Sequence, residues 1–251
     1  MTRVLITGGA AGLGASLAAA YRARGADVVV ADIAETAETA DGLHLDVRSE
    51  GDWAAARAWV EEHWGGLDVL VNNAGVAGGG RVDVATMEEW QWITEINLFG
   101  VVRGTRTFVP MMKQAGSGTI LNIASLAGLV HPAGMGSYNA VKAGVVAFTE
   151  TIGHELAAFG IRAAAVCPSY FRTGLMDSVQ GADTALSATM TKLVANAPLG
   201  PDDIAAAVLE GLDRGEELIL PDPAARAAYE LKLSDRAAYD AQLRRQAERL
   251  S

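Results

Sequence analysis

The sequence predicts an α/β fold in which a doubly wound sheet of about seven parallel strands carries helices on both faces. Short, continuously apolar runs alternate along the chain with longer segments of helical period. Uninterrupted apolar strands of this kind are typical of a parallel sheet that is buried on both faces. No internal repeat or low-complexity linker divides the chain, so we expect residues 1–251 to form a single domain.

The candidate strands are short runs rich in valine, leucine, isoleucine and alanine. They are Val4–Thr7, Asp27–Ala31, Leu43–Asp46, Asp68–Val71, Thr119–Ala124, Arg162–Cys167 and Glu217–Leu220.

The segments between these strands carry helix signals. Ser49 is a suitable N-cap for one helix, and Gly215 marks the C-terminal end of another. The main helical patterns cover Ser49–Trp64, Thr86–Asn97, Ser137–Phe159 and Pro201–Arg214.

Two segments depart from the alternation. Gly174–Leu199 is long for a loop yet keeps apolar side chains, which predicts a lid over a substrate. Pro223–Ser251 is helix-prone and charged, with a break expected at Ser234–Asp235, so we expect a helical C-terminal tail.

Composition and charge narrow the function classes. The net charge of −10 argues against a nucleic-acid partner, which would need a basic surface. No apolar run reaches the roughly 18 residues of a membrane span, and Met1–Gly9 lacks the long apolar core of a signal peptide. We therefore expect a cytoplasmic protein that does not bind membranes. The one cysteine, Cys167, is interpreted as a packed thiol, and the histidines do not cluster, so no metal site is expected.

The first strand runs into a glycine-rich segment and then a helical pattern, an arrangement that predicts a Rossmann-type dinucleotide site. Gly8, Gly12 and Gly14 allow a sharp turn and a close backbone approach to a pyrophosphate at the helix N-terminus. A short turn containing glycines is the alternative interpretation of this segment taken alone.

The second strand ends at Asp32, where a dinucleotide fold places the acid that accepts hydrogen bonds from the adenosine ribose hydroxyls. A carboxylate there repels a 2′-phosphate. The neighbouring positions Ala11, Ile33 and Ala34 offer no cation to bind one, so NAD is the expected cofactor. A strand-end turn former is the alternative interpretation of Asp32.

Tyr138 and Lys142 lie four residues apart in one helical pattern, which places a phenol and an ammonium group on the same helix face. A nearby cation stabilises phenolate and suits tyrosine to general acid–base work. Ser125 follows an apolar strand at its carboxyl end, where ligands bind in open α/β sheets. Asn97 ends another helical pattern.

Taken together, these residues resemble the short-chain dehydrogenase/reductase (SDR) family over roughly residues 3–175. The matching segments are Thr7-Gly8-x-x-x-Gly12-x-Gly14, Asp46-Val47, Asn72-Asn73-Ala74-Gly75, Asn97, Ser125 and Tyr138-x-x-x-Lys142.

The resemblance implies roles for these positions. Tyr138 would exchange a proton with the substrate oxygen, to which Ser125 would donate a hydrogen bond. Lys142 would bind the nicotinamide ribose and lower the pKa of Tyr138, and Asn97 would hold a water linking Lys142 to solvent. The implied cofactor contacts are Gly8, Ala11, Gly12, Leu13, Gly14, Asp32, Ile33, Asp46, Val47, Asn73, Ala74, Gly75, Tyr138, Lys142, Pro168, Phe171 and Thr173.

Two features depart from the family pattern. Ser169 stands where the family usually has glycine after Pro168, which would tighten the loop that reaches the nicotinamide. The charged tail replaces the family's frequent glycine-rich ending, which helps to build a tetramer. A homodimer or a homotetramer is expected.

The implied activity is NAD-dependent interconversion of a secondary alcohol and its ketone. Candidate pocket residues, with the apolar lid, indicate an apolar or aromatic substrate; they are Ala127, Leu129, His131, Met135 and Tyr170. Two alternatives stay open. One is a non-catalytic, NAD-sensing binding protein, although such proteins typically lose Tyr or Lys. The other is a sugar-nucleotide epimerase or dehydratase, whose glycine spacing would require glycine at Ala11.

Overall fold

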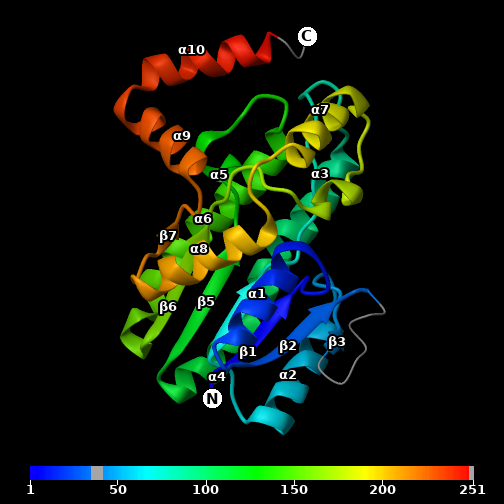
Figure 1. Cartoon of the computed structure of the whole chain (residues 1–251). Helices are drawn as coiled ribbons and strands as arrows, with labels where there is room; N and C mark the ends of the chain where they lie inside the picture. The colour runs from blue at the N-terminus through cyan, green and yellow to red at the C-terminus, as the bar shows by residue number, and fades with distance from the viewer. Residues whose placement is uncertain (35–41, 249–251) are drawn as a thin grey trace.

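The computed structural model describes residues 1–34 and 42–248. Its centre is a sheet of parallel strands in the order β3-β2-β1-β4-β5-β6-β7 (Figure 1). The strands are β1 (Arg3–Thr7), β2 (Asp27–Asp32), β3 (Gly42–His44), β4 (Val69–Asn72), β5 (Gly118–Ile123), β6 (Ile161–Val166) and β7 (Leu218–Ile219).

Helices cover both faces of the sheet, as the continuously apolar strands predict, and further helices lie beyond the carboxyl ends of the strands (Figure 1). They are α1 (Gly12–Ala23), α2 (Glu50–Trp64), α3 (Met87–Thr94), α4 (Gly100–Ala115), α5 (Ala127–Val130), α6 (Gly136–Leu156), α7 (Thr184–Ala195), α8 (Pro201–Asp213), α9 (Pro223–Ser234) and α10 (Arg236–Ala247). Side chains alternate along each strand, so that Val4 and Ile6 pack with α1 and α8, while Leu5 packs with α2, α4 and α6. The doubly wound α/β fold is therefore confirmed.

Local sequence signals explain where several helices begin and end. Ser49 caps α2 by accepting a hydrogen bond from the amide of Asp52, and Gly65 ends this helix in the left-handed region. Thr86 and Glu89 form a reciprocal capping box at the start of α3. Gly215 follows α8 with a φ of 81°, as expected for a C-terminal stop.

Some boundaries differ from the sequence prediction. The helix expected over Thr86–Asn97 is α3 followed by a π-helical turn at Glu95–Phe99, and Asn97 lies within that turn. The third strand ends at His44 rather than Asp46, because the amide of Asp46 donates to the Asp52 carboxylate as the chain turns toward α2.

The lid and tail segments are both helical. The expected lid contains a short 3₁₀ turn, Gly174–Ser178, and α7. The tail consists of α9 and α10, which meet at Asp235 as the expected break predicts, and its residues 249–251 lie outside the described part of the chain. Figure 1 shows α10 lying across the end of the molecule above α5. Among the described helices, none is long and apolar enough to cross a membrane.

Candidate active site

The carboxyl ends of the strands open into one cavity of about 1270 Å³. It lies where the strand order reverses between β1 and β4, which is where doubly wound folds bind ligands. The cavity is lined by most of the site residues expected from the sequence. These are Gly8, Ala11, Gly12, Leu13, Asp32, Ile33, Asp46, Val47, Asn73, Ala74, Gly75, Ser125, Tyr138, Lys142, Pro168, Phe171 and Thr173.

The glycine-rich loop is held tightly against the end of β4. Asn73 donates its side-chain amide to the carbonyls of Thr7 and Gly8, at 2.9 Å each. Thr7 in turn accepts the backbone amides of Asn73 and Ala74. Gly8 has a φ of 61°, and a Cβ there would lie 2.7 Å from the Cα of Ala74. Only glycine fits this turn, so the backbone stays open toward the cavity.

The N-terminus of α1 borders the cavity beside this loop, with Ala11, Gly12 and Leu13 in the lining. Ala11 occupies the N-cap, and its methyl side chain makes no capping hydrogen bond to the first turn of the helix. The amides of this turn and the partial positive charge of the helix end fit a pyrophosphate. A dinucleotide thus matches the cradle that these residues form.

Asp32 borders the cavity beside this loop. Its carboxylate accepts the backbone amides of Ala10 at 3.0 Å and Ala34 at 3.1 Å, which fix its orientation. A carboxylate has about four acceptor positions, so further ones remain for ribose hydroxyls. Ile33 is 66% exposed and brings no charge to this wall.

Arg48 is a cavity-lining cation that sequence reasoning missed. It pairs with Asp46 at 2.6 Å through a side-chain contact, and this pairing holds the pKa of the Asp46 carboxyl below its usual range. The Asp46-x-Arg48 spacing was the available signal. In the described residues that line the cavity, Arg48 and Lys142 are the cationic side chains.

Ser125, Tyr138 and Lys142 meet on one wall of the cavity. Ser125 lies just beyond β5, while Tyr138 and Lys142 share a face of α6, with the Lys142 ammonium 5.8 Å from the centre of the Tyr138 ring. Lys142 donates to the carbonyl of Ile123 at 2.8 Å, which ties α6 to the end of β5. All three side chains therefore reach one point at the end of the sheet.

Burial dominates the proton affinities at this wall. It raises the pKa of the Tyr138 hydroxyl to about 12, against a hydrogen bond with Ser125 that lowers it. It lowers the pKa of Lys142 to about 8. Desolvation is the largest influence on the pKa of Tyr138 here, and Lys142 is not among its causes, since the ammonium donates to the carbonyl of Ile123. The expected lowering of the Tyr138 pKa by Lys142 therefore stays a prediction.

Two expected site residues do not line the cavity. Asn97 is 1% exposed, and its amide accepts from the backbone of Val76 at 2.8 Å and donates to the same residue at 2.9 Å. The π-helical turn directs it to that loop. Gly14 lies behind the glycine loop, where a Cβ would be 2.2 Å from the carbonyl oxygen of Gly8, so its absence of a side chain permits helix α1 to approach.

The loop after β6 holds the last group of expected contacts. The hydroxyl of Thr173 is 3.1 Å from the position of a Cβ on Gly12, so this loop closes against the glycine-rich one. Ser169 donates its amide and its hydroxyl to Asp222, at 2.9 and 2.6 Å. The serine at the family's glycine position thus connects this loop to the start of the tail.

The rest of the cavity forms a compartment with mostly apolar walls. Of the pocket residues expected from the sequence, Ala127, Met135 and Tyr170 line it, whereas Leu129 and His131 do not. The imidazole of His131 instead lies 3.1 Å from the carbonyl of Gly128 and 3.2 Å from the Lys232 ammonium. The segment expected to be the lid contributes apolar side chains, among them Leu175, Met176, Val179, Leu186, Met190, Leu193 and Val194.

Residues 174–199, expected to be a lid, are attached to the body at their turns. Asp183 is 2% exposed, caps α7 and accepts the Arg81 guanidinium at 2.8 Å. Ser178 accepts the amide of Ala77, and Glu89 accepts that of Ala182. Across residues 1–34 and 42–248, no group of three or more His, Cys, Asp or Glu side chains is arranged to hold a metal.

Comparison with known proteins identifies the family to which the chain is similar. The short chain dehydrogenase family model matches residues 2–183. A 3-alpha-(or 20-beta)-hydroxysteroid dehydrogenase of Mycobacterium tuberculosis is 40% identical over 184 residues, which cover 70% of this chain and 71% of that protein. A cyclopentanol dehydrogenase of Comamonas testosteroni is 34% identical over 218 residues, covering 82% and 87% of the two chains.

A solved structure agrees with these relatives. A short-chain dehydrogenase/reductase from Burkholderia phymatum, in complex with NAD, is 30% identical and superposes with a TM-score of 0.86, covering 93% of both chains. The glycine-rich loop, the Ser125–Tyr138–Lys142 wall and these matches agree, and the chain belongs to the short-chain dehydrogenase family.

Proposed function

We propose that this protein is an NAD-dependent oxidoreductase that interconverts an apolar or aromatic secondary alcohol and its ketone. The observation that carries the proposal is that one cavity joins a dinucleotide cradle to Ser125, Tyr138 and Lys142. Residues 1–251 would act as one catalytic domain, with 174–199 as its lid.

The chain's own residues supply the proton chemistry. With a pKa of about 12, the Tyr138 hydroxyl is protonated at neutral pH and is ready to donate to the substrate oxygen during ketone reduction. Ser125 would hydrogen-bond the same oxygen and orient it toward Tyr138. The positive charge of Lys142 would stabilise the phenolate that remains.

The cofactor, when bound, supplies or accepts the hydride. Its pyrophosphate would lie at the N-terminus of α1, its adenosine ribose at Asp32 and its adenine beside Asp46 and Val47. Lys142 would bind the nicotinamide ribose, and Phe171 and Thr173 would border the nicotinamide. The expected role of Asn97, to hold a water that links Lys142 to solvent, stays a prediction. The Asn97 side chain forms its hydrogen bonds with the backbone of Val76.

We propose NAD rather than NADP because of the charges at the ribose end. Asp32 is fixed by two backbone amides and cannot turn away easily, and Ile33 beside it is exposed and uncharged. Arg48, a cavity-lining cation that follows β3, is already paired with Asp46. A 2′-phosphate would therefore face a carboxylate.

We also propose a homodimer or homotetramer and a cytoplasmic location. Phe99 and Phe159, near the ends of α4 and α6, are 43% and 41% exposed and would be covered by pairing of these helices between subunits. Sedimentation analysis of the full chain tests the oligomeric state, and a monomer at micromolar concentration contradicts it.

The test of the activity is a turnover assay. Secondary alcohols with NAD, and their ketones with NADH, are followed by nicotinamide absorbance across small cyclic, aromatic and polycyclic compounds. Turnover of at least one pair supports the proposal. Tight NAD binding without turnover of any compound would favour a sensing protein.

A further inference from the structure

The C-terminal helix α10 presents one face to the substrate side of the cavity. Tyr239, Gln242, Leu243 and Gln246 all line it, together with Ala228 of α9. The spacing of three, four and seven residues from Tyr239 places these four side chains in one stripe along the helix. The family model ends at residue 183, so this wall is built by a part of the chain beyond it.

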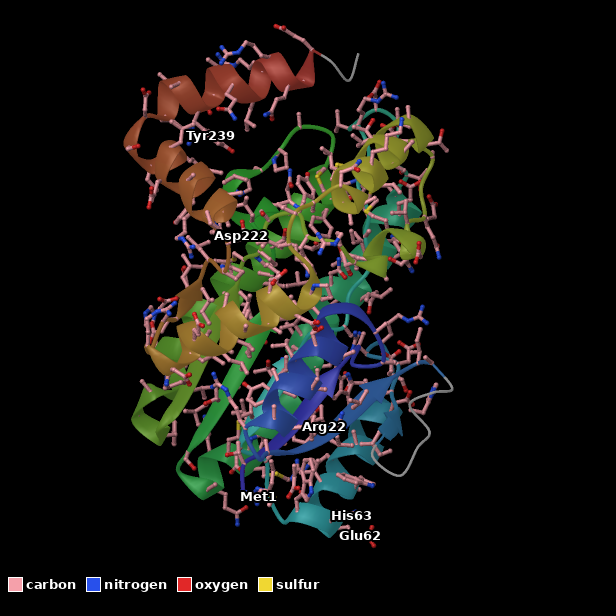
Figure 2. All side chains as sticks on the ribbon, viewed as in Figure 1. Met1, Arg22, Glu62, His63, Asp222 and Tyr239 are labelled. Atoms are coloured by element: carbon pink, nitrogen blue, oxygen red, sulfur yellow. The ribbon has the colours of Figure 1, made fainter. Side chains whose placement is uncertain are left out.

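The tail is docked onto the element that follows Ser125. The Tyr239 hydroxyl donates to the carbonyl of Val130, and Tyr239 itself is 3% exposed. Lys232 donates to the carbonyl of Leu129 and meets the ring of His131. Figure 2 shows Tyr239 on the side of α10 that faces the body of the molecule. Short α5 is therefore held between the active-site serine and the tail.

A second anchor joins the tail to the loop that borders the nicotinamide position. Asp222 is 1% exposed and lies at the base of α9 (Figure 2), which it caps through the amide of Ala225. The same carboxylate accepts both hydrogen bonds from Ser169, which follows Pro168 directly. The tail is thus fixed at both segments that flank the reacting end of the cavity.

The distribution of polar and apolar residues along this compartment indicates what kind of ligand it fits. Ser125 and Tyr138 are polar at the reacting end, and residues such as Val130, Met135 and Met190 are apolar along the walls. At α10, the solvent-exposed side chains of Gln242 and Gln246 border the cavity and offer amides that donate and accept hydrogen bonds without carrying charge. The volume of about 1270 Å³ exceeds the roughly 300–1,000 Å³ of a usual ligand site, which leaves room for a long substrate beside a dinucleotide.

We propose that α9 and α10 form the far wall of the substrate compartment and that Gln242 and Gln246 determine specificity. The substrate they select is an elongated, largely apolar alcohol or ketone with an uncharged hydroxyl or carbonyl at the end remote from the reacting carbon. This inference rests on the proposed function and assigns the substrate class of the same site.

The test compares three probes with NAD. They are cyclopentanol, a steroid alcohol that bears a ketone at the opposite end, and the same steroid alcohol without that ketone, each steroid as both epimers of the alcohol. We expect the ketone-bearing steroid to have the highest kcat/KM. Gln242→Leu and Gln246→Leu should each raise its KM by about threefold to tenfold, as expected for one lost hydrogen bond at a side chain that is exposed without ligand.

Matched controls separate this effect from loss of folding. The variants should change kcat/KM for cyclopentanol and the ketone-free steroid by less than about twofold. Arg244→Leu, an exposed residue of α10 outside the cavity lining, should change none of the three. Equal effects of the glutamine variants on all three probes, or no preference of the wild type for the ketone-bearing steroid, overturn the inference. Absence of turnover with every alcohol overturns the proposed function instead.

The anchor is tested through its position. Ser169→Ala removes the hydroxyl that bonds to Asp222, and we expect faster hydrogen exchange in α9 and α10 with a higher KM for the ketone-bearing steroid. The factor by which KM rises for this probe should exceed the factor for cyclopentanol by at least about threefold. Unchanged exchange in the tail, or equal losses for both probes, contradicts the anchoring role.

Discussion

At the cofactor end of the cavity the glycine-rich loop presents its backbone, which hydrogen bonds to the end of β4 hold in place, whereas at the substrate end the walls are side chains from the lid and the tail. Gly8 and Asn73 illustrate the cofactor end. Gly8 has no side chain to cover the backbone, and Asn73 donates a hydrogen bond to the Gly8 carbonyl. Met190 and Gln242 illustrate the substrate end, since they come from the lid and the tail. A backbone cradle suits a ligand that is shared across a family, and a side-chain wall suits a ligand that varies.

The largest expected effect separates catalysis from cofactor binding, and it comes from replacing the Tyr138 hydroxyl. Tyr138→Phe should lower turnover by about 100- to 10,000-fold, because the ring still packs while the proton donor is lost. NADH affinity should stay within a few-fold, since the backbone cradle is untouched. Steady-state kinetics and fluorescence titration with NADH measure the two quantities. A variant that keeps a tenth of wild-type turnover would exclude Tyr138 as the acid.

The cofactor end is tested by its charge. We expect NAD to be preferred over NADP by at least about 100-fold in kcat/KM, since charge-assisted hydrogen bonds to Asp32 are worth about 1.5–3 kcal/mol each and a phosphate would be repelled. Asp32→Ala should narrow the ratio, and adding Ile33→Arg should invert it. Kinetics with both cofactors decide the matter, and a wild type that prefers NADP contradicts the assignment.

A pH profile sharpens the reacting end. Lys142 has a pKa of about 8, so it is positively charged below that pH and neutral above it. Because the charge stabilises the phenolate left by Tyr138, we expect kcat/KM for ketone reduction to fall as pH rises through about 8. Lys142→Met should be slower at every pH and lack this descending limb. A wild-type profile that is flat from about pH 7 to 10 would contradict the role of the charge.

The substrate end should differ from the cofactor end in its dynamics. Residues 174–199 turn apolar side chains toward the cavity and are attached to the body through polar contacts such as those of Ser178, Ala182 and Asp183, so we expect them to exchange hydrogen faster than β5 and to gain protection with NADH and ketone. Asp183→Ala removes the α7 cap, worth about 0.5–2 kcal/mol, and should accelerate exchange further. Equal protection with and without ligands would argue against a lid.

The sequence by itself determined the sheet, its flanking helices and most of the cofactor-site residues that line the cavity. These features depend on local rules: strand period, helix caps, glycine at Gly8 and a spacing of four between Tyr138 and Lys142. Each rule acts over a few residues, so it can be read without knowing where the rest of the chain lies. For the same reason, the Ser49 cap and the break at Asp235 were predictable.

Only the tertiary structure decided which distant groups meet. A π-helical turn directs Asn97 to Val76, burial rather than Lys142 governs the pKa of Tyr138, and His131 meets Lys232 outside the cavity. The contact of Ser169 with Asp222 joins positions 53 residues apart, and α10 reaches a cavity that begins at Gly8. No periodic pattern encodes such contacts, because they depend on how packed elements approach one another and on which groups lose water as they do so.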